Sequence, residues 1–167
     1  MIPSDHFVRF YNEVFKALQE KGHEHLVAYW REIGRQQSEE LSDTFREGGL
    51  QACHDYWGRI IHEENCEGEL RLTDDYFEFK MTKCPSLSKA MDNDADACDL
   101  YCDHCMGWVG PTLKAAGLHG AHDMESRTEP HCVLRVYTDA EKARAFKKQA
   151  QLPAESGEDA PDISDMD

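Results

Sequence analysis

Five of the seven cysteines lie in one 49-residue stretch, and their spacing is the strongest chemical signal in the chain. The stretch runs from Cys84 to Cys132 and includes the run Cys98-Asp-Leu-Tyr-Cys102-Asp-His-Cys105, a C-x3-C-x2-C pattern. Thiolates bind soft and borderline metals, and one zinc ion or one iron–sulfur cluster takes about four of them. The stretch therefore predicts a cysteine-ligated metal site.

Helix geometry limits which four cysteines can converge. Residues three apart on a helix are neighbours, so Cys102 and Cys105 can share one metal, whereas Cys98 and Cys105 would lie about 10 Å apart along a regular helix. If the helix begins after Cys98, which then curls back from the loop, the predicted ligands are Cys84, Cys98, Cys102 and Cys105. If Cys98 is itself helical, Cys132 from the last strand completes the set.

The nature of the cofactor stays open between a 4Fe–4S cluster and a zinc ion. The C-x3-C-x2-C spacing is that of the cluster loop of radical SAM enzymes, but the chain is short for that family's barrel and shows no SAM-binding pattern. Zinc is satisfied by the same thiolates. An interpretation without metal also remains, because cysteines on one helical face can simply pack in a core.

His104 is the candidate catalytic residue. It lies inside the cysteine run and points about 100° away from its neighbours if the segment is helical. We expect it beside the metal without being a ligand, titrating near neutral pH and moving a proton to or from a bound small molecule. A nucleophilic Cys–His pair is an alternative, and His131 beside Cys132 is a second candidate for its base.

The elements that hold these residues follow from apolar periodicity. Helical spacing predicts three amphipathic helices over about 4–22, 23–49 and 50–68, each ended by glycine. Alternation then predicts a hairpin of 70–72 and 77–81 about the Asp74-Asp75 turn. The remaining expected elements are a short helix opened by Pro85, a main helix over about 99–116 with Asp99 as its N-cap, strands near 121–128 and 131–137, and a short terminal helix near 142–148.

This order of elements predicts a single α+β domain over residues 1–150, with N-terminal helices packed against a small antiparallel sheet and a later cysteine-bearing helix. Residues 151–167 are predicted to be an acidic disordered tail, because six acids and no base follow Pro153.

The net charge of the chain argues against nucleic acids and anionic membranes as binding partners. The chain carries 33 acids against 18 bases, a formal charge of −15, so phosphate backbones and anionic lipid repel it. No apolar run is long enough to span a bilayer, and the first residues lack a secretory signal. We expect a cytoplasmic protein whose partner is a small-molecule ligand or substrate, neither nucleic acid nor membrane; the sequence leaves the oligomeric state open.

Four segments resemble the L-2-amino-thiazoline-4-carboxylic acid hydrolase-like family: Tyr29-Trp-Arg-Glu-Ile-Gly34, Cys84-Pro85, Tyr101-Cys-Asp-His-Cys105 and Cys132-Val-Leu-Arg-Val-Tyr137. The resemblance covers roughly residues 25–137. It implies hydrolytic opening of a small cyclic C–N bond, with cysteines at the positions of Cys84, Cys102 or Cys105, and Cys132. The additional Cys98 and the second cysteine of the C-x2-C pair depart from that pattern and suit a closed cluster or structural metal better.

The sequence thus predicts a cytosolic metal-binding protein, carrying a 4Fe–4S cluster or zinc, that supports a small-molecule enzyme similar to hydrolases of cyclic C–N bonds. Whether it is an enzyme at all stays open. The alternative is a non-enzymatic module that senses metal or redox state and binds a ligand.

Overall fold

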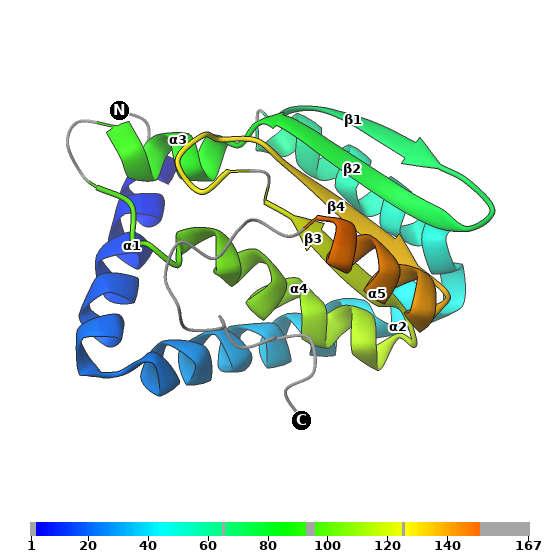
Figure 1. Cartoon of the computed structure of the whole chain (residues 1–167), viewed down its shortest axis with the longest axis horizontal. Helices are drawn as coiled ribbons and strands as arrows, with labels where there is room; N and C mark the ends of the chain where they lie inside the picture. Colours follow the sequence, from blue (N-terminus) through cyan, green and yellow to red (C-terminus); the bar gives the residue numbers. More distant parts are fainter. Residues whose placement is uncertain (1–2, 65, 93–95, 125, 151–167) are drawn as a thin grey trace.

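The computed structural model describes residues 3–64, 66–92, 96–124 and 126–150, so the predicted acidic tail lies outside the described residues. The chain forms one antiparallel four-stranded sheet with helices on both faces (Figure 1). The α+β class predicted from the sequence is confirmed.

The first two helices meet at a sharp corner. Helix α1 (Pro3–Lys21) and helix α2 (His23–Glu63) are separated by Gly22, whose φ of 137° is open to glycine but not to other residues. Helix α2 bends again at Gly49, with φ 56° and ψ −140°. The predicted second and third helices are therefore the two arms of α2, divided where the glycine pair was expected to divide them.

The sheet consists of β1 (Glu67–Leu72), β2 (Tyr76–Lys83), β3 (His119–Asp123) and β4 (Cys132–Tyr137). The strand order is β1-β2-β4-β3, so β4 lies between β2 and β3, and β3 is an edge strand. The hairpin predicted about Asp74-Asp75 is confirmed. The third strand begins earlier and is shorter than the predicted 121–128.

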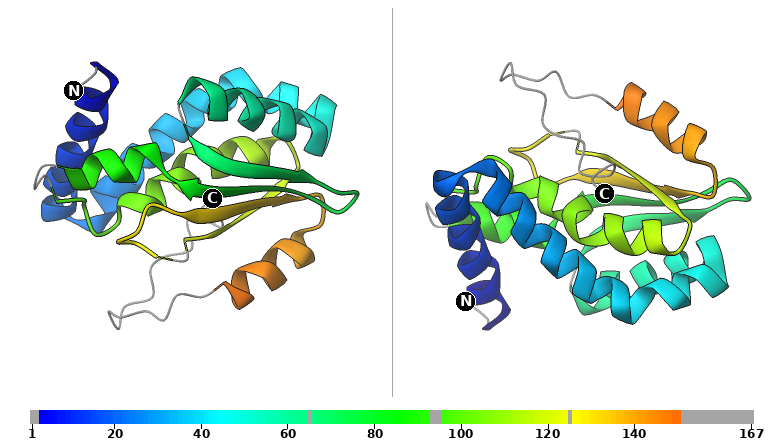
Figure 2. Two further views of the ribbon diagram at one scale, coloured as in Figure 1. Left: turned by 90° about the horizontal axis from the view of Figure 1, so that it is seen from above. Right: turned by 90° about the horizontal axis from the view of Figure 1, so that it is seen from below.

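The two faces of the sheet have different covers. Phe77 and Val136 on one face pack with Phe45 and Trp57 of α2 and with Leu113 of α4 (His104–Ala115) in a single buried cluster. The opposite face is covered by α5 (Ala140–Gln149), as the views in Figure 2 show. Among the described residues, no helix combines the length and the apolar composition needed to cross a membrane.

Helix α4 (His104–Ala115) begins later than predicted. Residues 98–103 instead make i to i+3 hydrogen bonds, from Tyr101 N–H to the Cys98 carbonyl at 2.8 Å and from Asp103 N–H to the Leu100 carbonyl at 3.0 Å. These bonds produce the 3-10 helix η2 (Tyr101–Asp103), so Asp99 is not the N-cap of α4. The short helix opened by Pro85 is α3 (Pro85–Met91), as expected.

Helices α2 and α4 touch through their backbones. A Cβ atom on Gly34 of α2 would stand 2.6 Å from the Gly107 carbonyl oxygen, and one on Gly107 of α4 would stand 2.8 Å from Trp30 Cβ. Trp30 is fully buried, so it has no room to retreat. The crossing therefore fixes the position of α4, and with it the cysteines at its start.

We predict that Gly107→Ala destabilises the fold by about 1–3 kcal/mol, because the added methyl group overlaps the buried Trp30 side chain. Gly110→Ala in the same helix is the matched control: its Cβ would meet only Met106 Cε, at 3.7 Å, and alanine favours helix by up to about 1 kcal/mol over glycine. Urea denaturation of both variants measures the difference. Equal stabilities would contradict the tight crossing.

Candidate functional site

Two cysteines lie at one end of the sheet on neighbouring strands. Cys84 directly follows β2 and Cys132 begins β4, and these strands pair antiparallel with Met81 opposite Cys132. The Cys84 N–H donates to the Pro130 carbonyl at 2.6 Å, which ties the two strand ends together. Since side chains alternate along a strand, Cys132 faces the same side as Val136, toward α2 and α4.

The start of α4 brings two more thiols to this end of the sheet. Cys102 lies in η2 and Cys105 in the first turn of α4. Burial raises the pKa of the Cys105 thiol well above its usual value, and the thiols of Cys84, Cys132 and Cys102 lie close enough to raise it further. We call Cys84, Cys102, Cys105 and Cys132 the thiol cluster. Its members come from four separate places in the fold.

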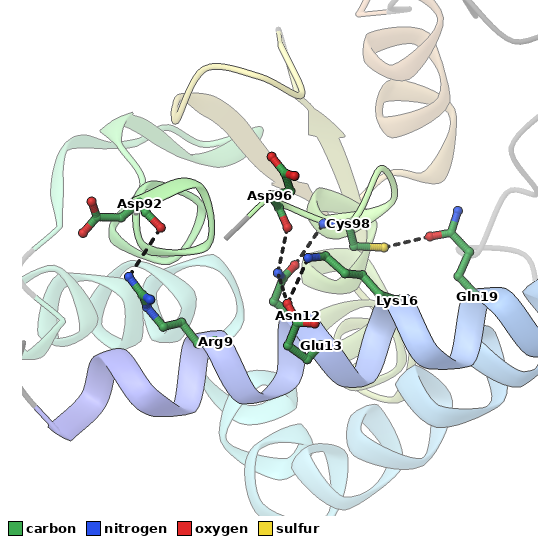
Figure 3. A network of polar contacts seen from close by, with 8 residues as sticks. All are labelled: Arg9, Asn12, Glu13, Lys16, Gln19, Asp92, Asp96 and Cys98. Carbon is green, nitrogen blue, oxygen red and sulfur yellow. Dashed lines mark hydrogen bonds and ion pairs between the residues drawn. The ribbon is translucent and has the colours of Figure 1, made fainter. Parts of the chain in front are cut away.

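Cys98 is directed elsewhere. Its backbone N–H donates to Asn12 Oδ1 at 2.9 Å, and its Sγ donates to Gln19 Oε1 at 2.9 Å, both on α1 (Figure 3). The side chain is 5% exposed and packs in a core that Cys84 and Cys102 border. Helix α4 does begin after Cys98, as one arrangement required, but the thiol points to α1 instead of curling toward Cys105.

Asn12 holds Cys98 in this orientation through hydrogen bonds to the backbone. It is completely buried, and besides accepting from Cys98 it donates through Nδ2 to the Asp96 carbonyl at 3.0 Å. Asp96 has a φ of 49°, so the chain turns sharply where the amide holds it. In Figure 3, Arg9, Asn12 and Gln19 of α1 point toward Asp92, Asp96 and Cys98, respectively. Helix α1 thereby sets the path by which the chain enters η2.

His104 lies beside the thiol cluster inside an aromatic cage. Its ring centroid is 4.5 Å from that of Trp108 and 4.9 Å from that of Tyr101, and the side chain is 4% exposed. Burial lowers the pKa of His104 to about 4. The imidazole is therefore neutral at pH 7, and the expectation that it titrates near neutral pH is wrong.

The hydrogen bonds of His104 fix its tautomer. Nδ1 contacts the Tyr101 carbonyl oxygen, which can only accept, so Nδ1 carries the proton and Nε2 is left as an acceptor. Nε2 faces Cys105 Sγ at 3.8 Å. The arrangement is a thiol, a base and a carbonyl that orients the base, as in sites with a nucleophilic cysteine. The raised pKa of Cys105 and the lowered pKa of His104 both oppose transfer of the thiol proton in the resting protein.

A second imidazole, that of His122, lies near His104. His122 on β3 lies two residues after Gly120, whose Cα faces Leu113 and Met106 of α4, so His122 points to the same side. Burial lowers its pKa to about 4, against the opposing effect of Asp103. Within the described part of the chain, the buried Nδ1 of His122 has no hydrogen-bond partner.

Three hydroxyl groups near the thiol cluster form a closed triangle. Tyr11 Oη lies 2.5 Å from Ser86 Oγ, Ser86 Oγ lies 2.7 Å from Tyr101 Oη, and Tyr101 Oη donates to Tyr11 Oη at 3.0 Å. The thiols of Cys105 and Cys84 are close enough to raise the pKa of Tyr11, which burial already raises. Rotatable O–H donors therefore adjoin the sulfurs.

Arg127 is a positively charged residue close to Cys102 of the thiol cluster. Arg127 forms a two-pronged ion pair with Asp103, including Arg127 Nη2 to Asp103 Oδ1 at 3.2 Å. Burial, and then the thiol of Cys84, raise the pKa of Cys102 to about 12, while Arg127 acts in the opposite direction. The guanidinium thus favours the thiolate form of Cys102.

Sequence reasoning missed three parts of this site. Cys66, just before β1, is near enough to Cys84 for that thiol to add to the effect of burial in raising the Cys66 pKa to about 11. His122 and the Tyr11–Ser86–Tyr101 triangle were not recognised either. The signals were weak. A regular hairpin about Asp74-Asp75 would put Cys66 opposite Lys83, and the register shift between Glu67 and Gly68 cannot be predicted from the spacing. Tyr11 has the spacing of an ordinary apolar helix position.

No family model, curated protein or solved structure matches this chain. The resemblance to the thiazoline hydrolase-like family therefore rests on the four quoted segments alone. Within residues 3–64, 66–92, 96–124 and 126–150, no group of three or more His, Cys, Asp or Glu side chains is arranged so that it could hold a metal ion.

We predict that His122 makes stability fall in mild acid. Its pKa is about 4 in the folded chain against 6.5 unfolded, so the unfolded state binds the extra proton between these values. Its contribution of about 1–3 kcal/mol is complete above pH 6.5 and is lost as pH falls toward 4. His122→Gln should flatten the slope of unfolding free energy against pH in this window, measured by urea denaturation of reduced protein. His6→Gln, at an exposed position, controls for loss of an imidazole; an unchanged slope in His122→Gln would contradict the assignment.

Proposed function

We propose that this protein binds a metal, either a 4Fe–4S cluster or a zinc ion, through Cys84, Cys102, Cys105 and Cys132. The observation that carries the proposal is the surroundings of Cys105, whose thiol has the three others as electrostatic neighbours. Two of these come from strand ends that are 48 residues apart in sequence, Cys84 and Cys132. Four thiols converging from separate elements are hard to explain by core packing alone.

The electrostatic interactions within the thiol cluster favour the binding of a cation. The thiol of Cys84 raises the pKa of Cys102, and the thiols of Cys84, Cys132 and Cys102 raise that of Cys105, because two thiolates close together in a poorly solvated place repel. A metal ion removes this repulsion and binds the deprotonated sulfurs directly. Coordination at about 2.3 Å requires the four cysteine side chains to turn toward a common point.

The sequence left open whether Cys98 or Cys132 is the fourth ligand, and the surroundings of the two side chains favour Cys132. Cys98 already donates its thiol proton to Gln19, and the charged groups around it are Asp99, Lys16 and Asp103. Cys132 instead stands beside Cys105. We therefore favour the set in which Cys132 replaces Cys98.

A hydrolase of small cyclic C–N bonds is a second candidate, and the His104–Cys105 contact favours it. In this case the Cys105 thiol gives its proton to His104 Nε2 and attacks an amidine-like carbon, and the imidazolium returns the proton to the departing nitrogen. Water then attacks the carbon of the resulting thioimidate, the C–S bond breaks, and the Cys105 thiol is regenerated. The family resemblance of the segment containing Cys102 and Cys105 supports this activity, whereas a metal bound by Cys105 would exclude it as nucleophile.

Anaerobically purified protein is expected to carry about one metal site per chain, as zinc or as iron with acid-labile sulfide. Cys105→Ser and Cys132→Ser should lose it. Cys98→Ser is the matched control and should keep it, because serine can make the same hydrogen bond to Gln19. Elemental and sulfide analysis gives the result.

Two outcomes would contradict this assignment. Full occupancy in Cys105→Ser would remove the thiol cluster as the site. Loss of metal in Cys98→Ser together with full occupancy in Cys132→Ser would restore Cys98 as the fourth ligand.

The hydrolase candidate has its own test. His104→Gln should lower turnover of cyclic amidines and thiazolines by at least about 100-fold, while the melting temperature and metal content stay near those of the parent chain. His131→Gln is the control for the other candidate base, because His131 Nε2 lies 2.9 Å from Glu129 Oε2. Absence of turnover by the intact protein across a wide panel would leave the sensing module as the function.

A further inference from the structure

Cys66 and Cys84 face each other across the ends of two paired strands. Cys66 immediately precedes β1 and Cys84 immediately follows β2. The last pair of that antiparallel ladder is Glu67 with Lys83, and their side chains form an ion pair of 3.1 Å between Lys83 Nζ and Glu67 Oε1. The register shifts by one residue between Glu67 and Gly68, and if the shifted register is continued by one position, Cys66 comes opposite Cys84.

This placement meets the requirements of a disulfide. Opposed residues in an antiparallel pair have Cα atoms about 4.5–5.5 Å apart, inside the roughly 4.4–6.8 Å that disulfides span. Both residues are thiols here, and Cys84 is close enough to act on the pKa of Cys66. The strand ends are also held from outside the pair, by the Cys66 N–H to Ile61 carbonyl bond at 3.2 Å and by the contact of Cys84 with Pro130.

We propose that Cys66 and Cys84 form a reversible disulfide, which makes this pair an oxidative modification site and withdraws Cys84 from the thiol cluster. The disulfide itself follows from the strand register. Its consequence for metal binding rests on the proposed function, since only a metal held by Cys84 would be lost when Cys84 is oxidised.

The reaction is thiol–disulfide exchange with a small disulfide such as oxidised glutathione. The Cys66 thiolate attacks one glutathione sulfur, which forms a mixed disulfide and releases one glutathione thiolate. The Cys84 thiolate then attacks Cys66 Sγ and releases the second. The two cysteines lose two protons and two electrons in total, and oxidised glutathione is reduced to two molecules of glutathione.

The order of the two steps follows from position. Cys66 precedes β1, which is the edge strand of the sheet, whereas Cys84 follows the interior strand β2 and caps α3 through its Sγ, which accepts from the Leu87 N–H at 3.3 Å. An oxidant therefore reaches Cys66 first. Burial raises the pKa of Cys66 to about 11, so exchange is slow at neutral pH and the experiment must run to equilibrium.

The test uses reduced, metal-free full-length chain equilibrated in glutathione buffers of increasing oxidised fraction. Remaining thiols are alkylated, and tryptic peptides are mapped by mass spectrometry. A Cys66–Cys84 cross-linked peptide is the expected first product. Cys66→Ser should lose this peptide and leave Cys84 alkylated. Cys66 found reduced while other cysteines pair, or found paired with a cysteine other than Cys84, would overturn the proposal.

Metal binding is then measured on the same samples. Oxidised parent chain should bind zinc at least about tenfold more weakly than reduced chain, while Cys66→Ser treated with the same buffer should bind as before treatment. If reduced chain binds no metal at all, the proposed function fails and the cross-link map still decides the disulfide. If oxidised chain with a mapped Cys66–Cys84 bond binds zinc undiminished, the withdrawal of Cys84 is overturned.

Discussion

The backbone contact between α2 and α4 is the constraint on which the rest of the structure depends. Two glycines, Gly34 and Gly107, let the helix axes approach until one carbonyl would touch a neighbouring Cβ. Because α2 also packs on the sheet through Trp57 and Phe77, this contact locks α4 at a fixed height above the strands. The first turn of α4 then has one possible position, over the strand ends that carry Cys84 and Cys132.

The site assembled there has an unusual balance of groups. Its sulfurs are enclosed and their ionisation is opposed by burial and by one another, yet a neutral imidazole, three hydroxyl donors and a guanidinium stand around them. These groups stabilise a thiolate once metal binding or a reaction has created it. In the resting protein the sulfurs can remain neutral thiols. The same site is therefore compatible with a metal centre and with a nucleophilic thiol, because both use sulfur in its anionic form.

Much of this could be predicted from the sequence, and the failures have physical reasons. Glycine positions and apolar periods located the helices and the hairpin, since local propensity governs them. The start of α4 was wrong because i to i+3 bonds after Cys98 compete with the α-helix, and nothing in the local residue types distinguishes the two. The orientation of Cys98 depends on Asn12, which lies 86 residues earlier. The neutral state of His104 depends on rings from α1 and α4, and such long-range packing has no local signature.

The strand order has a consequence for how the protein matures. Strand β4 lies between β2 and β3, so a nascent chain that has not yet reached Cys132 can build only the β1-β2 hairpin and leaves the hydrogen-bonding edge of β2 open. Contacts of such long sequence separation form late. Any metal that needs Cys132 must accordingly be inserted after Cys132 has been synthesised, and chains released before that point would have an exposed strand edge and an incomplete set of thiols.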